Sequence, residues 1–581
     1  MKNIINKILV LFFIGFLSFA CNEMDLNPLA EGSSEGWYSN DTEVDMSLDY
    51  LFDILFWDPN PHPKYWSSGG WYDFWTDDFT NRTALSPIQG GTINSESDFV
   101  IDIWNYYYKC IAAANLLIEK LETPAYNLSA SKKAQYTGNA RFVRARMYSK
   151  LIFLWGDVPY FTKTLTVAEA FATGRTAKAT ILQGIYDDFD YAISVLPKSY
   201  ASKKYATKGS ALGLKARIAL FMHDYTTARD AAKACMDLGV YELYPDFGEL
   251  FYSKTRQTKE AVFSIARSVT LGTWPLGNYL RPENCRHIAP RSNGGNSFVW
   301  PSWDLWCSFL CTDGLPIDES PLYNPRNPFE NRDPRCSETI AEWGTRFGGI
   351  IIQPHPDSLV TTKYVNGTRV TNYDCRSVIQ WASFNGINWK KRFNEDWWDD
   401  FNTDPEHMVI RYADVLLYYA EAKIELNEID QSVLDAINMV RARAYKVNYN
   451  QVGLYPAVTT TNQSELRKAL RVERHMEFAF EGLRHNDIIR WKLAEKVLNI
   501  PAYGMIDPPG QKAKLVQTGL YFFPYVTPID EDGVPDFTQM YNDGYVKVLS
   551  VRYFDPTKHY LWPIPAKEIL INPNITQNPN Y

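Results

Sequence analysis

Three glutamates within residues 464–491 have the residue type and spacing of a catalytic carboxylate pair. Glu473, Glu477 and Glu481 follow one another at four-residue steps in a run rich in helix formers. On a helix, side chains four residues apart lie about 6 Å from each other, close to the roughly 5 Å between the two carboxyl groups of a retaining glycosidase. Such an enzyme needs one carboxyl group to stay protonated near neutral pH. Nearby arginines favour the ionised form instead.

The position of these glutamates on the predicted helix indicates that they have a structural role. At about 100° per residue, Glu473 falls inside the apolar face of the predicted helix, and Arg467, Arg471 and Arg474 form the adjoining stripe. A carboxylate directed into a core must be paired, or it shifts its pKa and becomes neutral. We therefore predict a scaffold helix held by buried ion pairs, and catalysis is the less favoured interpretation.

Charge and composition exclude several classes of function. The formal net charge of −8 becomes −10 when Lys2 and Lys7 of the N-terminal segment are removed. This argues against a nucleic-acid partner, which needs a basic surface. The eight histidines are dispersed and no HExxH motif occurs. Seven cysteines follow Cys21 without a framework spacing, which favours buried thiols and leaves one disulfide open. We predict neither a metal nor a cofactor.

The N-terminus has the features of an export signal. Lys2 and Lys7 precede an apolar run at 8–20 that is too short to span a bilayer and ends in small residues ahead of Cys21. Residues 17–21 resemble a bacterial lipobox, and a plain secretory signal is the alternative. We predict a signal peptide at 1–20, a lipid anchor on Cys21 and a flexible linker at 21–40.

Long amphipathic helices are predicted early and late in the chain. The segment 211–239 fits a degenerate tetratricopeptide pattern of small residues where helices cross. A helical pair cannot bury its faces alone, so the pairs of 99–239 and 410–498 are expected to stack into one scaffold. The segments 57–98 and 240–408 lack a helical period and are expected to form an irregular half. The predicted helices are 41–56, 99–121, 132–155, 179–196, 207–222, 225–238, 410–426, 431–444, 464–481 and 486–498.

Four motifs, in order along the chain, resemble those of one family, the SusD/RagB nutrient-binding outer-membrane lipoproteins. The segment 140–162 is similar to an arginine-rich helix that ends in Gly-Asp-Val-Pro, and 410–428 to an Arg-x-Ala-Asp-x-Leu-Leu helix. The segment 473–491 resembles the Phe-Glu-Gly-x-Arg region. Pro563-Ile564-Pro565 with Gln577-Asn578-Pro579 resembles the C-terminal signature. Four ordered motifs are specific, whereas one alone is weak.

The resemblance implies a fold and a function. The expected fold is all-α, a superhelix of four tetratricopeptide-like helical pairs with a large irregular, loop-rich ligand-binding half, in a single domain at 41–581. The implied function is non-catalytic capture of a glycan at the cell surface. The glycan then passes to a SusC-like TonB-dependent transporter in the outer membrane, on which the lipoprotein sits as a lid.

The ligand-binding residues are predicted from the chemistry of sugar recognition. A pyranose presents a face of C–H groups to flat aromatic rings, while Asn and Arg side chains bind its hydroxyls. In the resembled family the ligand aromatics come from the loop before the first repeat and from the segment after the third, which correspond here to 66–82 and 274–306. For each tryptophan, packing against the scaffold is the alternative. The predicted residues are Trp66, Trp71, Trp75, Trp274 and Trp300 for stacking, with Asn81, Arg82, Arg291 and Asn293 as hydrogen-bonding partners.

Two other functions compete with glycan capture. Abundant Asp and Glu in the aromatic-rich loops leave open an extracytoplasmic glycan hydrolase, although no acid and base pair stands out. The helical repeats alone are also compatible with an adaptor that binds only a peptide or protein partner.

Overall fold

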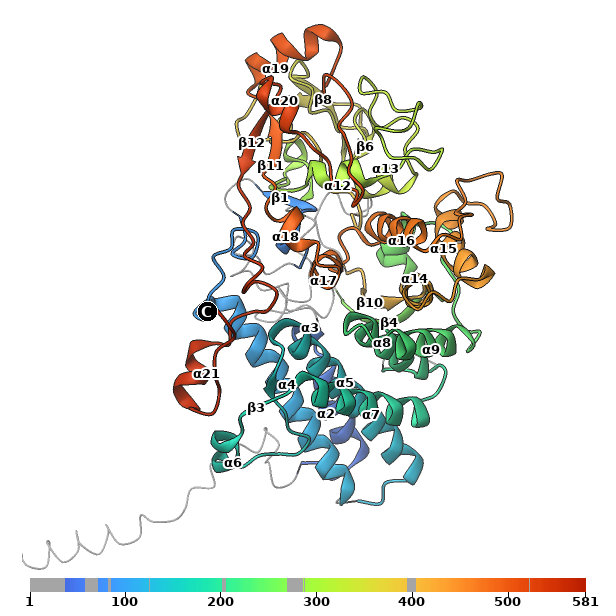
Figure 1. The fold of residues 1–581 in the computed structure, drawn as a ribbon, viewed down its shortest axis with the longest axis vertical. Coiled ribbons are helices and arrows are strands. Elements are labelled where there is room, and N and C mark those ends of the chain that lie inside the picture. Colours follow the sequence, from blue (N-terminus) through green and yellow to red (C-terminus); the bar gives the residue numbers. More distant parts are fainter. Residues whose placement is uncertain are drawn as a thin grey trace, which may run out of the picture.

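The computed structural model describes residues 37–57, 72–81, 85–124, 126–200, 205–268, 286, 288–393, 404–521 and 523–581. Figure 1 shows two regions, with helices α2 to α9 in the lower half and strands β6, β8, β11 and β12 in the upper half. Helices α14 to α17 lie between them. None of the helices in these ranges is long and apolar enough to cross a membrane.

The early helices form where the sequence predicts them. After α2 (Asp41–Leu51) come α4 (Asp98–Glu122), α5 (Ala130–Trp155), α7 (Lys178–Val195), α8 (Lys208–Phe221) and α9 (Tyr225–Met236). Local signals set their ends. The Ser129 side chain accepts a hydrogen bond from the Lys132 amide and caps α5, and Gly156 ends that helix with φ 76°. Consecutive helices pack as neighbours, α4 on α5, α5 on α7 and α8 on α9.

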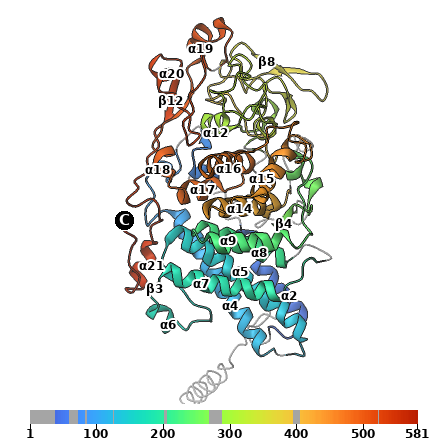
Figure 2. The same ribbon diagram turned by 45° about the vertical axis from the view of Figure 1, so that its right-hand side comes forward.

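The late helices continue the same helical body. They are α14 (Tyr412–Glu425), α15 (Gln431–Ala444), α16 (Gln463–Phe478), α17 (Arg484–Arg490) and α18 (Ala494–Val497). Helix α14 packs against α8 and α9 of the early set and against α15 and α16 of the late set, an arrangement visible in Figure 2. The predicted joining of the early and late helices is confirmed.

Within the described ranges, six small antiparallel sheets of two strands each make the all-α expectation incomplete. Their strands are only two to five residues long, too short to leave a readable alternation in the sequence. The pairs are β1 (Phe79–Asn81) with β5 (Val299–Pro301), β2 (Val158–Pro159) with β3 (Arg175–Thr176), β4 (Ala261–Ile265) with β10 (His407–Arg411), β6 (Arg346–Phe347) with β7 (Ile350–Ile351), β8 (Val360–Thr362) with β9 (Arg369–Thr371), and β11 (Ala502–Met505) with β12 (Val546–Ser550).

The β4–β10 ladder closes the long segment between α9 and α14. Strand β4 follows α9, and β10 leads directly into α14, so their pairing brings the two ends of the intervening chain together. The Tyr412 amide donates to the Glu260 carbonyl at 2.8 Å and continues this junction. The described cysteines of the chain are free and buried.

The remaining described elements are short, both in the predicted irregular half and outside it. They are α3 (Ile54–Trp57), η2 (Tyr72–Trp75), α6 (Val167–Ala172), η3 (Glu249–Phe251), η4 (Ser253–Thr255), η5 (Arg291–Asn293), α12 (Trp303–Ser308), α13 (Arg335–Thr339), α19 (Pro508–Lys514), η7 (Val516–Thr518), α20 (Thr538–Asn542) and α21 (Ala566–Ile571).

Candidate ligand-binding site

The three glutamates of the α16 region are ion-paired and buried. Glu477 is 0% exposed and accepts hydrogen bonds from Arg411 Nη1 at 2.6 Å and Arg335 Nη1 at 3.0 Å, and also from Arg443. Burial alone would raise its pKa, but these guanidiniums outweigh burial and hold the pKa well below its ordinary value. An ionised Glu477 cannot serve as a proton donor near neutral pH.

Glu473 on the same helix and Glu481, three residues beyond its end, are held in the same way. Glu473 accepts from Arg335 Nη1 at 2.6 Å and from Arg441 Nε at 2.8 Å. Glu481 accepts from Arg411 Nε at 2.8 Å and from Lys391 Nζ at 2.7 Å. The cations belong to α13, α15, β10 and a loop, so the cluster joins the irregular half to the helices. The prediction of a scaffold helix held by buried ion pairs is confirmed.

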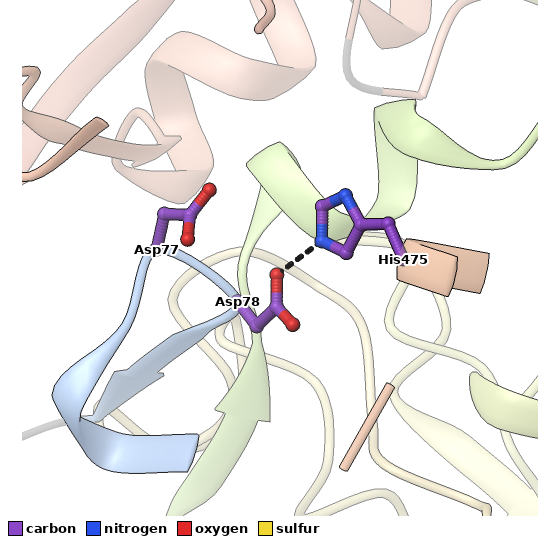
Figure 3. Close-up of side chains that lie close together, drawn as sticks. All are labelled: Asp77, Asp78 and His475. Carbon is purple, nitrogen blue, oxygen red and sulfur yellow. Dashed lines mark hydrogen bonds and ion pairs between the residues drawn. The ribbon is translucent and has the colours of Figure 1, made fainter. Parts of the chain in front are cut away.

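A second ionic cluster anchors the segment 73–78, which precedes β1. Arg484 of α17 donates to both Asp77 oxygens, from Nε at 3.0 Å and from Nη2 at 2.6 Å, and Asp78 is hydrogen-bonded to His475 of α16. Burial would raise the pKa of Asp77, but Arg484, His475 and Arg552 outweigh it and lower the pKa to about 2. Figure 3 shows Asp77, Asp78 and His475 converging from two elements.

This cluster has the residue types of a metal site, but not all of its ligand atoms are available to a metal ion. The reachable atoms of Asp77, Asp78 and His475 lie within 4.8 Å of one another. Both oxygens of Asp77 are taken by Arg484, however, and that guanidinium already supplies the positive charge that a cation would bring. The arrangement functions as a clamp between the loop and α16–α17.

The two segments predicted to carry the ligand meet at a β-ladder. Strand β1 pairs antiparallel with β5, with Thr80 opposite Trp300 and Asn81 opposite Val299. The next residue on the second segment extends the junction, because the Ser302 amide donates to the Asp78 carbonyl at 2.8 Å and its hydroxyl donates to the Asp77 carbonyl. Residues more than 200 positions apart in the sequence are therefore side by side.

The predictions for Trp75 and Trp300 are wrong. Both side chains are 0% exposed. Trp75 packs edge-on against Trp562 at 4.9 Å and His485 at 5.2 Å between ring centroids, and Trp300 packs against Phe384 at 5.4 Å. A ring enclosed in this way cannot stack on a sugar. Trp300 instead joins β5 to the segment that carries Phe384, and Trp75 joins η2 to α17 and the C-terminal segment.

The remaining predicted residues fall into two groups. Arg291 and Asn293 form the half-exposed ends of η5, where the backbone amides of Arg291 and Ser292 each donate to the Asp374 carboxylate at 2.9 Å. Asn81 ends β1. The side chain of Asn81 lies outside the described residues, as do Trp66, Trp71, Arg82, Trp274 and the anchor residue Cys21.

The comparisons with known proteins identify the family. The family model described as "SusD family" matches residues 259–581. This chain belongs to the SusD family. A second model, described as "Starch-binding associating with outer membrane", matches residues 71–220 of this SusD-family chain.

Several relatives span nearly the whole SusD-family chain. A SusD-like carbohydrate binding protein from Bacteroides fragilis is 28% identical, with a TM-score of 0.74 over 93% of this chain and 100% of that chain. SusD-like protein P25 from Formosa agariphila is 24% identical over 87% of this chain and 93% of its own length. Surface glycan-binding protein A from Bacteroides fluxus shares the fold, with a TM-score of 0.62. It is 20% identical, and the match covers 94% of this chain and 100% of that chain.

Two exposed rings of this SusD-family chain were not among the predicted stacking residues. Tyr373 and Trp381 are 46% and 45% exposed and flank Asp374, the carboxylate that binds the η5 amides, within one irregular turn segment. Phe384 of the same segment packs on Trp300, which places the segment beside the β1–β5 ladder. Trp381 lies in a Trp-rich stretch that the sequence indicates, but no local pattern separates it from its buried neighbours.

Proposed function

We propose that this protein captures a glycan, as an oligosaccharide or polysaccharide, at the cell surface and delivers it to a SusC-like TonB-dependent outer-membrane transporter. Membership of the SusD family carries this proposal, together with the 28% identical relative described as a carbohydrate binding protein. The match to a family described as starch-binding and associating with the outer membrane supports the location.

The proposed binding surface lies at the β1–β5 ladder. Tyr373 and Trp381 supply exposed rings for stacking, and Arg291 and Asn293 supply half-exposed hydrogen-bonding groups. Flat rings beside polar side chains are the combination that pyranoses require. The residues Trp66, Trp71, Asn81, Arg82 and Trp274 remain proposed contributors, because they flank the same ladder in the sequence.

We propose that the helices form four tetratricopeptide-like pairs within one domain at 41–581. A signal peptide at 1–20 and a linker at 21–40 would place a lipid on Cys21 and tether the domain to the outer membrane. Replacing Cys21 with alanine should then release the protein from the membrane fraction, and continued membrane association after a high-salt wash would contradict the anchor.

The protein is proposed to bind without catalysis. Asp77, Glu477 and Glu481 are paired with arginines, which hold the pKa of each of these carboxyl groups below its ordinary value, so they lack the raised pKa that an acid catalyst needs. Incubation with oligosaccharides followed by chromatography should show no shortened products.

The binding test compares the soluble protein lacking residues 1–21 with a Trp381→Ala/Tyr373→Ala variant. Titration against a panel of polysaccharides that includes soluble starch and laminarin should show at least about fivefold weaker binding by the variant, because each of the two stacked rings contributes about 0.5–1.5 kcal/mol. Phe171→Ala removes a ring that is 47% exposed on α6 and is the matched control. Equal affinity of the variant and the control would overturn the placement of the site.

A further inference from the structure

A hollow of ligand size lies on the helical scaffold, away from the surface at the β1–β5 ladder. It has a volume of about 650 Å³ and is lined by the loop after α9, the first residue of α14 and the end of α15 with the loop that follows it. These helices are neighbours in Figure 2. The volume falls within the 300–1,000 Å³ typical of small-molecule sites. None of its lining residues belongs to the segments 72–81 or 288–301 around the β1–β5 ladder.

Three tyrosines form the apolar walls of this hollow, which we call the tyrosine groove. The ring centroids of Tyr241 and Tyr412 lie 6.3 Å apart, and the two ring planes are inclined by 32°. Tyr449 lines the groove from the loop after α15. The Tyr241 ring is seated on Gly209 of α8, where an added Cβ would lie 2.1 Å from its hydroxyl oxygen. Its hydroxyl also lies 3.1 Å from Thr207 Oγ1. Tyr241 is therefore fixed in place before any ligand arrives.

Polar groups around the tyrosine groove are available for a ligand. Within the described part of the chain, no hydrogen bond is made by the hydroxyls of Tyr412 and Tyr449 or by the side-chain nitrogen Nδ2 of Asn448. Lys446 and Asp246 form an ion pair of 2.8 Å at the rim and hold the two loops together. Asn448 is exposed and both tyrosines are partly exposed, so all three groups are open to a ligand.

We propose that the tyrosine groove is a second glycan subsite, separate from the surface at the β1–β5 ladder. The proposal rests on the glycan-capture function proposed above. Neighbouring rings offer stacking faces to successive pyranose units, and the free hydroxyls and amide match sugar hydroxyls. The balanced ion pair at the rim leaves no excess charge for a phosphate or an acidic peptide. Two subsites on one chain raise the avidity for a polysaccharide without a new contact at either one.

The test measures stoichiometry by isothermal titration calorimetry on the chain lacking residues 1–21. The probes are seven-unit oligosaccharides prepared from starch, laminarin, xylan and mannan. Wild type should bind two oligosaccharides per chain. The Tyr412→Ala/Tyr449→Ala variant and the Trp381→Ala/Tyr373→Ala variant should each bind one. Tyr541→Ala, which removes a ring that is 47% exposed on α20, should retain two.

The outcomes separate this proposal from the capture function. One oligosaccharide per wild-type chain, unchanged by the groove substitutions, would overturn the groove and leave capture standing. No binding of any probe by wild type would overturn both. If the double variant does not fold, the single variant Tyr449→Ala replaces it in the test, because Tyr449 lies in a loop. A drop from two sites to one, or a tenfold weaker second site, supports the groove, and unaltered binding contradicts it.

Discussion

Replacing Glu477 with glutamine tests whether the buried cluster holds the two halves of the molecule together. The change preserves the side-chain shape but removes the negative charge between Arg335, Arg411 and Arg443, all of which are less than a tenth exposed. Removing one partner of a buried ion pair leaves uncompensated charge and costs about 3–5 kcal/mol. We expect the free energy of unfolding to fall by that amount.

The assay is urea unfolding followed by tryptophan fluorescence, with the loss seen as a lower midpoint at an unchanged slope. Glu425→Gln is the matched control. Glu425 accepts two hydrogen bonds from Arg467, at 2.7 Å and 2.8 Å, but its side chain is 19% exposed and that of Arg467 is 31% exposed. Water screens this pair, so its loss should cost about 1 kcal/mol or less. Equal losses in the two variants would refute the argument from burial.

Three further predictions concern residues of the site and its anchors. Trp75→Ala should lower the free energy of unfolding by about 3–5 kcal/mol, because the ring is 0% exposed, whereas Trp381→Ala should cost less than about 1 kcal/mol; urea unfolding measures both. Burial raises the pKa of Asp73 from 3.8 to about 7. The protonated Asp73 carboxyl therefore contributes up to ~4 kcal/mol to stability below pH 4, and this contribution is lost as the pH rises through 7. Asp73→Asn should lack this slope, and a wild-type slope in the variant would contradict the assignment. The pKa of Glu481 is lowered from 4.5 to about 2, because Arg411 and Lys391 outweigh burial. Its contribution is present above pH 4.5 and is lost as the pH falls through 2, a dependence that Glu481→Gln should not show.

The long helices could be predicted because their apolar faces repeat over many residues. The span of α5 departs from the prediction only at its first turn, and α15 matches it fully. The paired role of Glu477 also followed from local sequence, since arginines surround it on the helix surface. Its actual partners Arg335, Arg411 and Arg443 come from other elements, so no local pattern could name them.

The site was harder to predict than the scaffold for a physical reason. Trp75 and Trp300 lie in segments without periodicity, so nothing in the sequence indicates which side of the chain each ring occupies. Their burial depends on partners such as Trp562 and Phe384, which are distant in sequence. The β1–β5 ladder is only three residues long on each strand, so it likewise leaves no pattern in the sequence from which it could be predicted. The family resemblance predicted that both segments carry ligand residues, and the ladder does place the two segments side by side.

The position of the Glu477 cluster along the chain has a consequence for the order of folding. Glu473 and Glu477 come from α16, yet their partner Arg335 precedes that helix by well over a hundred residues, as does Glu260, which shares Arg411 with Glu477. The Asp77–Arg484 clamp spans 407 positions, and the Trp155 indole donates to the carbonyl of Pro563, 408 positions away. Closing such distant contacts is entropically expensive and slow. The arginines of the cluster therefore stay solvated during synthesis until the last third of the chain has emerged, and C-terminally truncated fragments should remain protease-sensitive.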